Sequence, residues 1–398
     1  MELLSPAGDL QKLRYAVHYG ADAVYAAGKH FGLRAKTSNL DNNELLTAAK
    51  FCHDNNCKIY VAVNIFAHNR DIEILPDYLQ FLQEIAVDAF IISDPAVFLL
   101  ARELAPEIPI HVSTQANVTS WKAAAFWKKQ GAKRIILARE LTFAEIRQIR
   151  EKLPDIELEM FVHGAMCMSY SGRCLLSSYL NARSANQGNC TQPCRWEYRL
   201  VEETRAGEYF PVEEDERGTY ILNSKDLCLI RRLPEISAAG IDSIKIEGRM
   251  KSLYYVANST RVYKEALLLA EQNKPLPSDL TDELNKISHR HYSEAFFDAF
   301  DSSQTQYTST SAYARDYQFV GEIVETEGCS VRLAVRSGFK IGEKLEIIFP
   351  DRRYDFQWRI DNISDADGEA LECSKPNTIV KIYLPEIIPS GGIIRKKK

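Results

Sequence analysis

The chain repeats one pattern over most of its length: a short apolar strand, a polar turn and then an amphipathic helix. Eight such units in roughly 250 residues are typical of a TIM-like (β/α)8 barrel. The expected strands span residues 2–5, 23–26, 59–64, 89–93, 108–113, 134–138, 157–163 and 243–247. The helices that should follow them span residues 9–19, 43–56, 73–87, 95–104, 118–130, 142–152, 226–239 and 252–272.

The pattern divides the chain into domains. The barrel should occupy residues 1–275, with a cysteine-rich insertion at 164–220 between the seventh strand and its helix. Pro275 and Pro277 then break the last barrel helix, and residues 276–316 read as a linker with a short helical run and a polar stretch. Residues 317–398 alternate in short strands with frequent turns, which predicts a small all-β barrel domain. Its expected strands lie in 319–328, 329–338, 343–350, 355–361 and 378–384.

Composition limits the partners and the compartment. The 398 residues are 45% hydrophobic, enough for a sizeable core, and the net charge of −5 gives no overall field that would attract nucleic acid. A nucleic-acid partner must therefore meet a local basic patch; Arg395–Lys398 is one candidate, interpreted here as a solvated tail. The opening MELLSP lacks a basic start, and no apolar run approaches the roughly 18 residues of a membrane span. We expect a cytoplasmic protein with no membrane partner.

Cysteines gather in one polar, glycine-punctuated segment. Cys167, Cys174, Cys190 and Cys194 lie within it, separated by six, fifteen and three residues, and Cys228 follows the next apolar run. Glycine, serine and asparagine surround them, so the backbone can fold closely around something while offering little apolar packing. The pattern favours a metal or cluster site. The wide spacing suits iron and sulfur better than a zinc knuckle, and proximity alone favours Cys194 as the fourth ligand.

The other cysteines occur in ordinary helix or strand patterns. We interpret them as small buried hydrophobic residues. They are Cys52, Cys57, Cys329 and Cys373.

Polar residues end several of the expected strands. Barrel active sites lie at the carboxyl ends of the strands, so these side chains should converge there. His163 would be an acid or base, a donor to a cluster sulfide, or a structural histidine. Lys245 and Arg249 would bind an anionic substrate or form an internal ion pair with Glu247. The candidates are Tyr25, Arg34, Asn64, Asp94, Ser113, Thr114, Gln115, Arg139, Glu140, His163, Lys245, Glu247 and Arg249.

One long motif resembles a known family. EMFVHGAMCMSYSGRCLLS, residues 159–177, matches the signature of peptidase family U32, the collagenase-like proteins. ELLSPAGD, GADAVYAAG, FGLRA, HVSTQ, NQGNCTQPCRW, YILNSKDLC and IKIEGRMKS are similar to that family too, so the resemblance covers most of residues 1–260. The β-rich tail resembles the carboxyl-terminal domain of its longer bacterial members.

The family name implies proteolysis, yet the sequence has no G-x-S-x-G elbow and no H-E-x-x-H helix. The resemblance implies instead an oxygen-independent hydroxylase that holds a four-iron four-sulfur cluster. Its ligands would be Cys167, Cys174, Cys190 and Cys228, with Cys194 as the alternate.

Within the family, the resemblance is strongest to the branch that converts a tRNA wobble uridine to 5-hydroxyuridine with prephenate as hydroxyl source. For this reaction we expect, among the polar residues at the strand ends, catalytic roles for His163, Glu247 and Gln115, and substrate contacts from Arg34, Asn64, Arg139, Lys245 and Arg249. The partners would be the tRNA anticodon region and an electron donor that the sequence does not identify, as it does not identify the oligomeric state. A zinc metallopeptidase and a non-catalytic RNA-binding or assembly factor with structural zinc are the alternatives.

Overall fold

The computed structural model describes most of the chain. The described residues are 1–29, 31–32, 39–166, 200–201, 209–210, 213–215, 218–220, 225–299, 313–389 and 391–398. Most of the expected insertion, 164–220, therefore lies outside them. The same holds for the expected site residues Arg34, Cys167, Cys174, Cys190 and Cys194.

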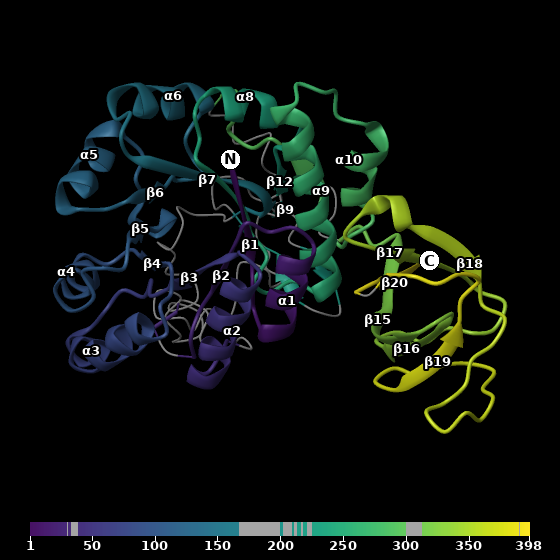
Figure 1. Cartoon of the computed structure of the whole chain (residues 1–398). Helices are drawn as coiled ribbons and strands as arrows, with labels where there is room; N and C mark the ends of the chain where they lie inside the picture. Colours follow the sequence, from purple (N-terminus) through teal and green to yellow (C-terminus); the bar gives the residue numbers. More distant parts are fainter. Residues whose placement is uncertain are drawn as a thin grey trace.

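Eight parallel strands form a closed barrel, as predicted (Figure 1). Each strand pairs with the next one along the chain, and the last strand, β13, pairs with both β7 and β1, which closes the ring. The strands are β1 (Glu2–Pro6), β2 (Ala23–Ala26), β3 (Lys58–Ala62), β4 (Ala89–Ile92), β5 (Ile110–Val112), β6 (Arg134–Ile136), β7 (Glu157–Ala165) and β13 (Ser243–Ile246).

Helices cover the outside of this ring (Figure 1). Several begin at polar caps: Asp41 and Thr142 each form a capping box with a glutamate three residues later, which satisfies two orphan backbone N–H groups. The barrel helices are α1 (Leu10–His18), α2 (Asn42–Asp54), α3 (Asn69–Glu84), α4 (Pro95–Leu104), α5 (Trp121–Gln130), α6 (Phe143–Lys152), α8 (Leu233–Ala238) and α9 (Leu253–Glu271). Among the described helices, none has the length and apolar character needed to cross a bilayer.

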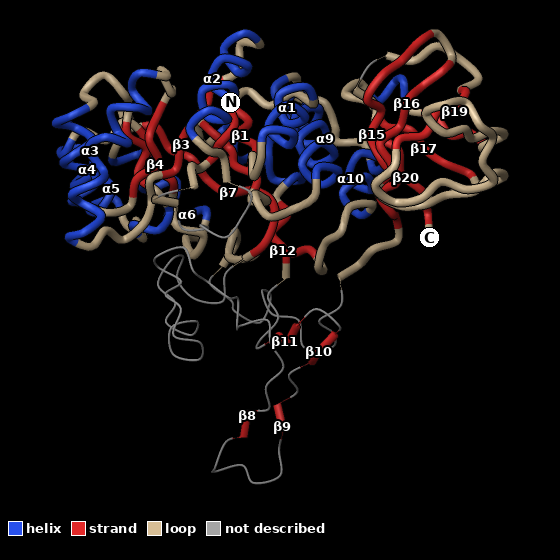
Figure 2. The backbone as a smooth tube through the Cα atoms, turned by 90° about the horizontal axis from the view of Figure 1, so that it is seen from below, coloured by secondary structure: helices blue, strands red, loops and turns tan. Residues whose placement is uncertain are grey.

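The helix predicted over 226–239 is wrong in its first half. Asp226–Cys228 form a strand, β12, which pairs antiparallel with β7; a 3-10 turn, η4 (Ile230–Arg232), separates it from α8. Pro234 explains where the helix begins, because proline fits the first turn of a helix and not its interior. A further short strand, β14 (Tyr292–Ser293), pairs parallel with β12, so the sheet continues beyond the closed ring. Figure 2 shows β12 beneath β7, at the lower edge of the barrel.

The carboxyl-terminal part is an antiparallel six-stranded sheet, which confirms the expected all-β domain. Helix α10 (Ser278–Asn285) lies in the segment expected to be a linker, and its Leu280 and Leu284 are buried in the apolar core of the barrel. The strands are arranged in the order β18-β17-β20-β15-β16-β19. Their bounds are β15 (Tyr317–Glu327), β16 (Ser330–Val335), β17 (Lys344–Ile348), β18 (Phe356–Arg359), β19 (Ile379–Tyr383) and β20 (Ile393–Lys397).

Two sequence interpretations fail in this domain: the burial of Cys329 and Cys373, and the solvated tail at 395–398. Cys52 and Cys57 are buried as expected, but Cys329 and Cys373 are exposed, because Cys329 lies in the turn between β15 and β16 and Cys373 lies in a loop. The basic end of the chain is not a solvated tail. Its residues from Ile393 to Lys397 form strand β20, in which Ile393, Ile394 and the Arg395 side chain are fully buried.

Arg395 joins the two domains through an ionic network. Its guanidinium donates to both carboxylate oxygens of Glu283 on α10, at 2.8 Å each, and to Glu346 on β17 at 2.8 Å. Arg261 on α9 adds an ion pair of 2.7 Å to Glu283 and one of 2.8 Å to Asp355 in the β-domain. The domains are therefore held together by buried charges that come from both sides of the interface.

Acid should weaken this interface. Burial acts to raise the pKa of Glu283, but hydrogen bonding and charge from Arg395, with the charge of Arg261, hold it well below its ordinary value of 4.5. A lowered carboxyl pKa contributes stability that is complete above the unfolded-state pKa and lost as pH falls through the folded one. We expect the melting temperature to decrease below about pH 4.5, and Glu283→Gln to flatten that decrease. An unchanged pH profile in Glu283→Gln would contradict the assignment.

Candidate active site at the barrel mouth

The cysteine-rich segment leaves and rejoins the barrel at one place. Strand β7 leads into it at Ala165, and β12 follows it. Their antiparallel pairing sets Asp226 opposite Ala165 and Cys228 opposite His163. Cys228 thus lies on the strand next to β7. In the sequence, Cys167 follows two residues after Ala165, the last residue of β7. Cys228, the last expected cluster ligand, therefore lies beside the strand from which the cysteine-rich segment begins.

The Cys228 thiol lies in a protected position. Its Sγ is 3.7 Å from the Tyr263 hydroxyl on α9. Burial raises the pKa of the thiol, while the backbone N–H of Ile230 acts in the opposite direction. Cys228 is thus a poor free nucleophile, and a bound cation would be needed to hold it as a thiolate. Among the described residues, no group of three or more histidine, cysteine, aspartate or glutamate side chains forms a metal site by itself.

A β-bulge points His163 away from the barrel axis. Lys245 pairs with Phe161, but the next residue of β13, Ile246, pairs with His163, so β7 carries one extra residue. Such a bulge re-aims the following side chain. The imidazole lies among three tyrosine rings, with centroids 5.8 Å from Tyr255, 5.3 Å from Tyr263 and 5.4 Å from Tyr292. His163 therefore lies between β7 and α9, on the same side as Cys228.

His163 is neutral at physiological pH. Burial lowers its pKa to about 3, and the nearby Lys251 and His289 act in the same direction. The Tyr263 hydroxyl donates to the Val162 carbonyl at 2.9 Å, so at the 3.4 Å contact the hydroxyl oxygen accepts from His163 Nδ1–H. Nε2 then carries the lone pair, and it meets no hydrogen-bond partner among the described residues. This imidazole can accept a proton or a hydrogen bond but is not a general acid at neutral pH.

Two glycines of the motifs make room for Tyr255. Gly164 has φ of +104°, and a Cβ there would lie 2.5 Å from the Glu247 carbonyl oxygen. A Cβ on Gly248 would lie 2.6 Å from the Tyr255 ring, whose hydroxyl donates to the Glu247 carbonyl at 3.0 Å. The ends of β7 and β13 and the start of α9 are therefore locked together where the cysteine-rich segment begins.

Gly164→Ala should destabilise the fold by about 2–4 kcal/mol, the sum of a left-handed backbone penalty and a backbone clash. Gly368→Ala is the matched control. Gly368 has φ of +95°, and a methyl group added there would meet nothing within 4 Å. It should lose only the backbone part, about 1–2 kcal/mol. Urea unfolding of both variants measures the difference, and equal losses would show that the contact with Glu247 is unimportant.

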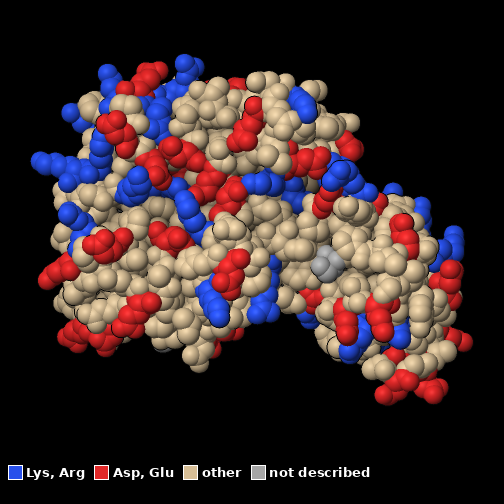
Figure 3. Space-filling view, viewed as in Figure 1, with Lys and Arg blue, Asp and Glu red and all other residues tan. Residues whose placement is uncertain are grey.

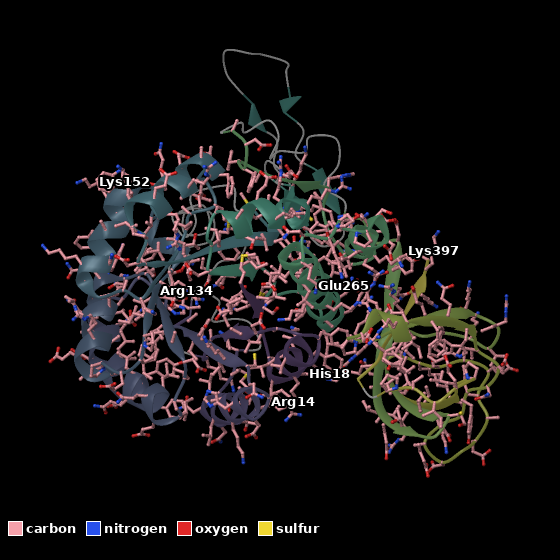
Figure 4. All side chains as sticks on the ribbon, turned by 45° about the horizontal axis from the view of Figure 1, so that its top comes forward. Arg14, His18, Arg134, Lys152, Glu265 and Lys397 are labelled. Atoms are coloured by element: carbon pink, nitrogen blue, oxygen red, sulfur yellow. The ribbon has the colours of Figure 1, made fainter. Side chains whose placement is uncertain are left out.

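Lys245 lies deep in the barrel and not at its open mouth. Its ammonium is 3.0 Å from Glu159 Oε1 and 4.3 Å from the centroid of the Tyr25 ring. Glu159 also accepts from Arg134 at 3.0 Å, and Arg134 contacts Glu2 at 2.5 Å. The expected alternative of an internal ion pair is therefore realised with Glu159 and not with Glu247. Figure 4 shows Arg134 among the strands of the barrel, whereas Lys152 lies on its outside.

Other predicted residues meet at the carboxyl ends of the strands. Asn64 Nδ2 donates to Gln115 Oε1 at 2.7 Å, which joins the loops after β3 and β5. Arg139 donates to the Ala165 carbonyl at 2.6 Å and lies over the Phe161 ring at 5.1 Å, which joins the end of β6 to the start of the cysteine-rich segment. Arg249 follows β13 and is buried. The mouth thus holds an amide pair and two arginines.

Sequence reasoning missed the tyrosines behind β7. Tyr255 and Tyr263 are eight residues apart on α9, a spacing that puts both on one helix face, so this pair could have been found. Tyr292 and Asp226 carried no such signal, because β12 and β14 were not expected as strands.

Comparison with known proteins identifies the family. The profile described as Peptidase family U32 matches residues 8–307, and the profile of the family's C-terminal domain matches residues 315–395. The chain belongs to peptidase family U32. Its signature residues now have structural roles: Glu159 binds Lys245, Phe161 lies beneath Arg139, and Gly164 admits Tyr255.

Several curated relatives are similar over long stretches. The tRNA hydroxylation protein P1 of Bacillus subtilis is 40% identical, covering 100% of this chain and 95% of its own length. The tRNA hydroxylation protein P of Escherichia coli is 39% identical over 96% of this chain and 93% of its own. A 23S rRNA 5-hydroxycytidine synthase of Escherichia coli is 37% identical over 67% of this chain and 39% of its own.

Proposed function

We propose that this chain hydroxylates a base of RNA, and specifically that it converts a tRNA wobble uridine to 5-hydroxyuridine without molecular oxygen, with prephenate as hydroxyl source. The long matches to proteins named for tRNA hydroxylation, at about 40% identity over nearly the whole chain, support this proposal most strongly. The rRNA hydroxycytidine synthase supports the wider class, because the product in its name also carries a hydroxyl group on a pyrimidine.

The proposed cofactor is a four-iron four-sulfur cluster held by Cys167, Cys174, Cys190 and Cys228, with Cys194 as alternate ligand. The donor set fits, because thiolates are the usual ligands of such clusters. Cys228 fits by position: it is a partly buried thiol on the strand paired with β7, which leads toward Cys167 in the sequence. When bound, the cluster would supply electron transfer.

The residues of the mouth suit a uracil and a carboxylate. A base in a single-stranded loop can be turned out of its stack and read on its hydrogen-bonding edge. The amide pair Asn64 and Gln115 offers both donors and acceptors for that edge. Arg139 and Arg249 would hold the carboxylates of prephenate, and Glu247 would hold or move a proton beside them. Lys245 and Glu159 act below, by fixing the floor of the site.

Iron, sulfide and zinc content of protein purified without oxygen tests this proposal. Roughly four irons per chain, with broad absorption near ~400 nm, is the expected result. One zinc per chain without iron would overturn it and favour a zinc peptidase or an RNA-binding factor with structural zinc.

Cys228→Ala should abolish cluster binding, because it removes a thiolate ligand. Cys194→Ala should keep most of the iron if Cys194 is only the alternate ligand. Cys329→Ala is the control, since Cys329 is exposed in the β-domain. Iron per chain and visible absorption are the readouts. Full iron in both Cys228→Ala and Cys194→Ala would show that the ligand assignment is wrong.

A further inference from the structure

Three cations surround one tyrosine ring beside the proposed active site. Lys251 Nζ lies 4.9 Å from the centroid of the Tyr313 ring, and the guanidinium carbons of Arg290 and Arg315 lie 5.2 and 5.5 Å from it. We call these four residues the Tyr313 cluster. Of the four, Lys251 alone belongs to a family motif, IKIEGRMKS.

The backbone fixes the Tyr313 cluster. His289 and Ala314 form an antiparallel bridge, with N–H···O bonds of 3.4 and 2.8 Å. Tyr313 and Arg315 flank Ala314, while Arg290 follows His289, so the bridge sets these side chains on one face. Arg315 Nε also donates to Ser288 Oγ at 3.3 Å. The arrangement is thus built by two paired segments and does not depend on chance contacts between long side chains.

The charge of the Tyr313 cluster favours an anion. Lys251, Arg290 and Arg315 contact the same ring, and like charges at such spacing repel each other. In the described part of the chain, the carboxylate that pairs with Lys251 is Asp226, whose Oδ2 is 3.9 Å from Nζ and also accepts from the Arg290 backbone N–H at 3.1 Å. Arginine pairs match the oxygens of a phosphate geometrically, and a lysine adds a point charge.

The Tyr313 cluster lies at the edge of the proposed active site. Asp226 pairs with Ala165, the last residue of β7, and Lys251 lies in the turn after β13. Lys251 also contacts the Tyr255 ring, which packs against His163. A ligand on the cluster would therefore be held next to the point where the cysteine-rich segment begins.

We propose that the Tyr313 cluster binds a backbone phosphate of the RNA substrate and so orients the loop that carries the target base. This inference rests on the proposed function. On the face drawn in Figure 3, acidic and basic side chains are interspersed. A local phosphate site of this kind supplies what the net charge of −5 does not.

Binding of a fluorescently labelled tRNA anticodon stem–loop, measured by anisotropy over a salt series, tests the proposal. Arg315→Gln should weaken binding about tenfold, as expected for one lost charge-assisted contact. It should also make the negative slope of log K against log salt less steep by about 0.7 to 0.9. Arg14→Gln is the charge-matched control, because Arg14 is exposed on α1. It should leave both quantities unchanged.

Equal effects of Arg315→Gln and Arg14→Gln would overturn the site and leave the proposed function standing, because that function is tested separately by metal content and nucleoside analysis. Lys251→Met supplies a second variant should Arg315→Gln fold poorly. Inorganic phosphate should compete with the RNA only at millimolar concentrations. If phosphate binds the wild type but all variants bind the RNA with the same affinity, the site holds a free anion and the RNA assignment is wrong.

Discussion

Glu159→Gln is expected to destabilise the protein by about 3–5 kcal/mol, the usual cost of removing one partner from a buried ion pair. Glu159 is fully buried and accepts from both Lys245 and Arg134 at 3.0 Å. Burial already lowers the pKa of Lys245, and Glu159 is the group that opposes this shift. Without the carboxylate, Lys245 would be held charged in the barrel interior beside the Arg134 guanidinium, or would be forced to lose its proton.

Glu157→Gln is the control for that experiment. Glu157 also pairs with Arg134, at 2.8 Å, but its side chain is 28% exposed, so solvent replaces part of the lost interaction. We expect a loss of about 1 kcal/mol or less. Urea denaturation of both variants gives the comparison. Similar small losses would show that the network around Lys245 is solvated and not a rigid floor for the site.

Arg395→Met is expected to cost about 3–5 kcal/mol as well, because it removes a fully buried guanidinium that pairs with both Glu283 and Glu346 at the domain interface. The double variant Arg395→Met, Glu283→Gln should recover part of the loss, since one of the carboxylates that lost this partner is then uncharged. Arg353→Met is the control. Arg353 is 84% exposed and pairs only with the nearby Asp351 among the described residues, so its loss should stay within about 0.5 kcal/mol.

Calorimetry distinguishes how the interface works. If the network couples the domains, wild type should melt in one transition and Arg395→Met in two, with the β-domain separating from the barrel. The coupling would be contradicted if Arg395→Met melted in a single transition and its melting temperature fell by less than that of the Arg353→Met control.

The barrel could be predicted because its strands are local signals. Each is a short apolar run that stands out from the amphipathic helix after it, and eight of them leave few other architectures. β12 and β20 were missed for the opposite reason. The three residues around Leu227 form a strand only because they pair with a free edge of β7. The basic run after Ile394 likewise forms a strand only because it pairs with a free edge of β15.

The site was predicted as a set of residue types, and its geometry was not. His163 was expected at the mouth, but one extra residue in β7 moves it behind the strand, and no local pattern reveals a bulge. Lys245 finds its partner in Glu159, 86 residues earlier in the chain, a pairing that only the closed barrel creates. Asn64 and Gln115 were both expected at the mouth, and the structure brings them to 2.7 Å of each other.

The central claim, hydroxylation of tRNA, is tested most directly by nucleoside analysis. A strain that lacks this protein and its paralogues is complemented with wild type, with Cys228→Ala or with the control Cys329→Ala, and its tRNA is digested for mass spectrometry. We predict 5-hydroxyuridine or its derivatives with wild type and Cys329→Ala, and their loss with Cys228→Ala. Equal hydroxyuridine in the uncomplemented strain, or full hydroxyuridine with Cys228→Ala, would contradict the account.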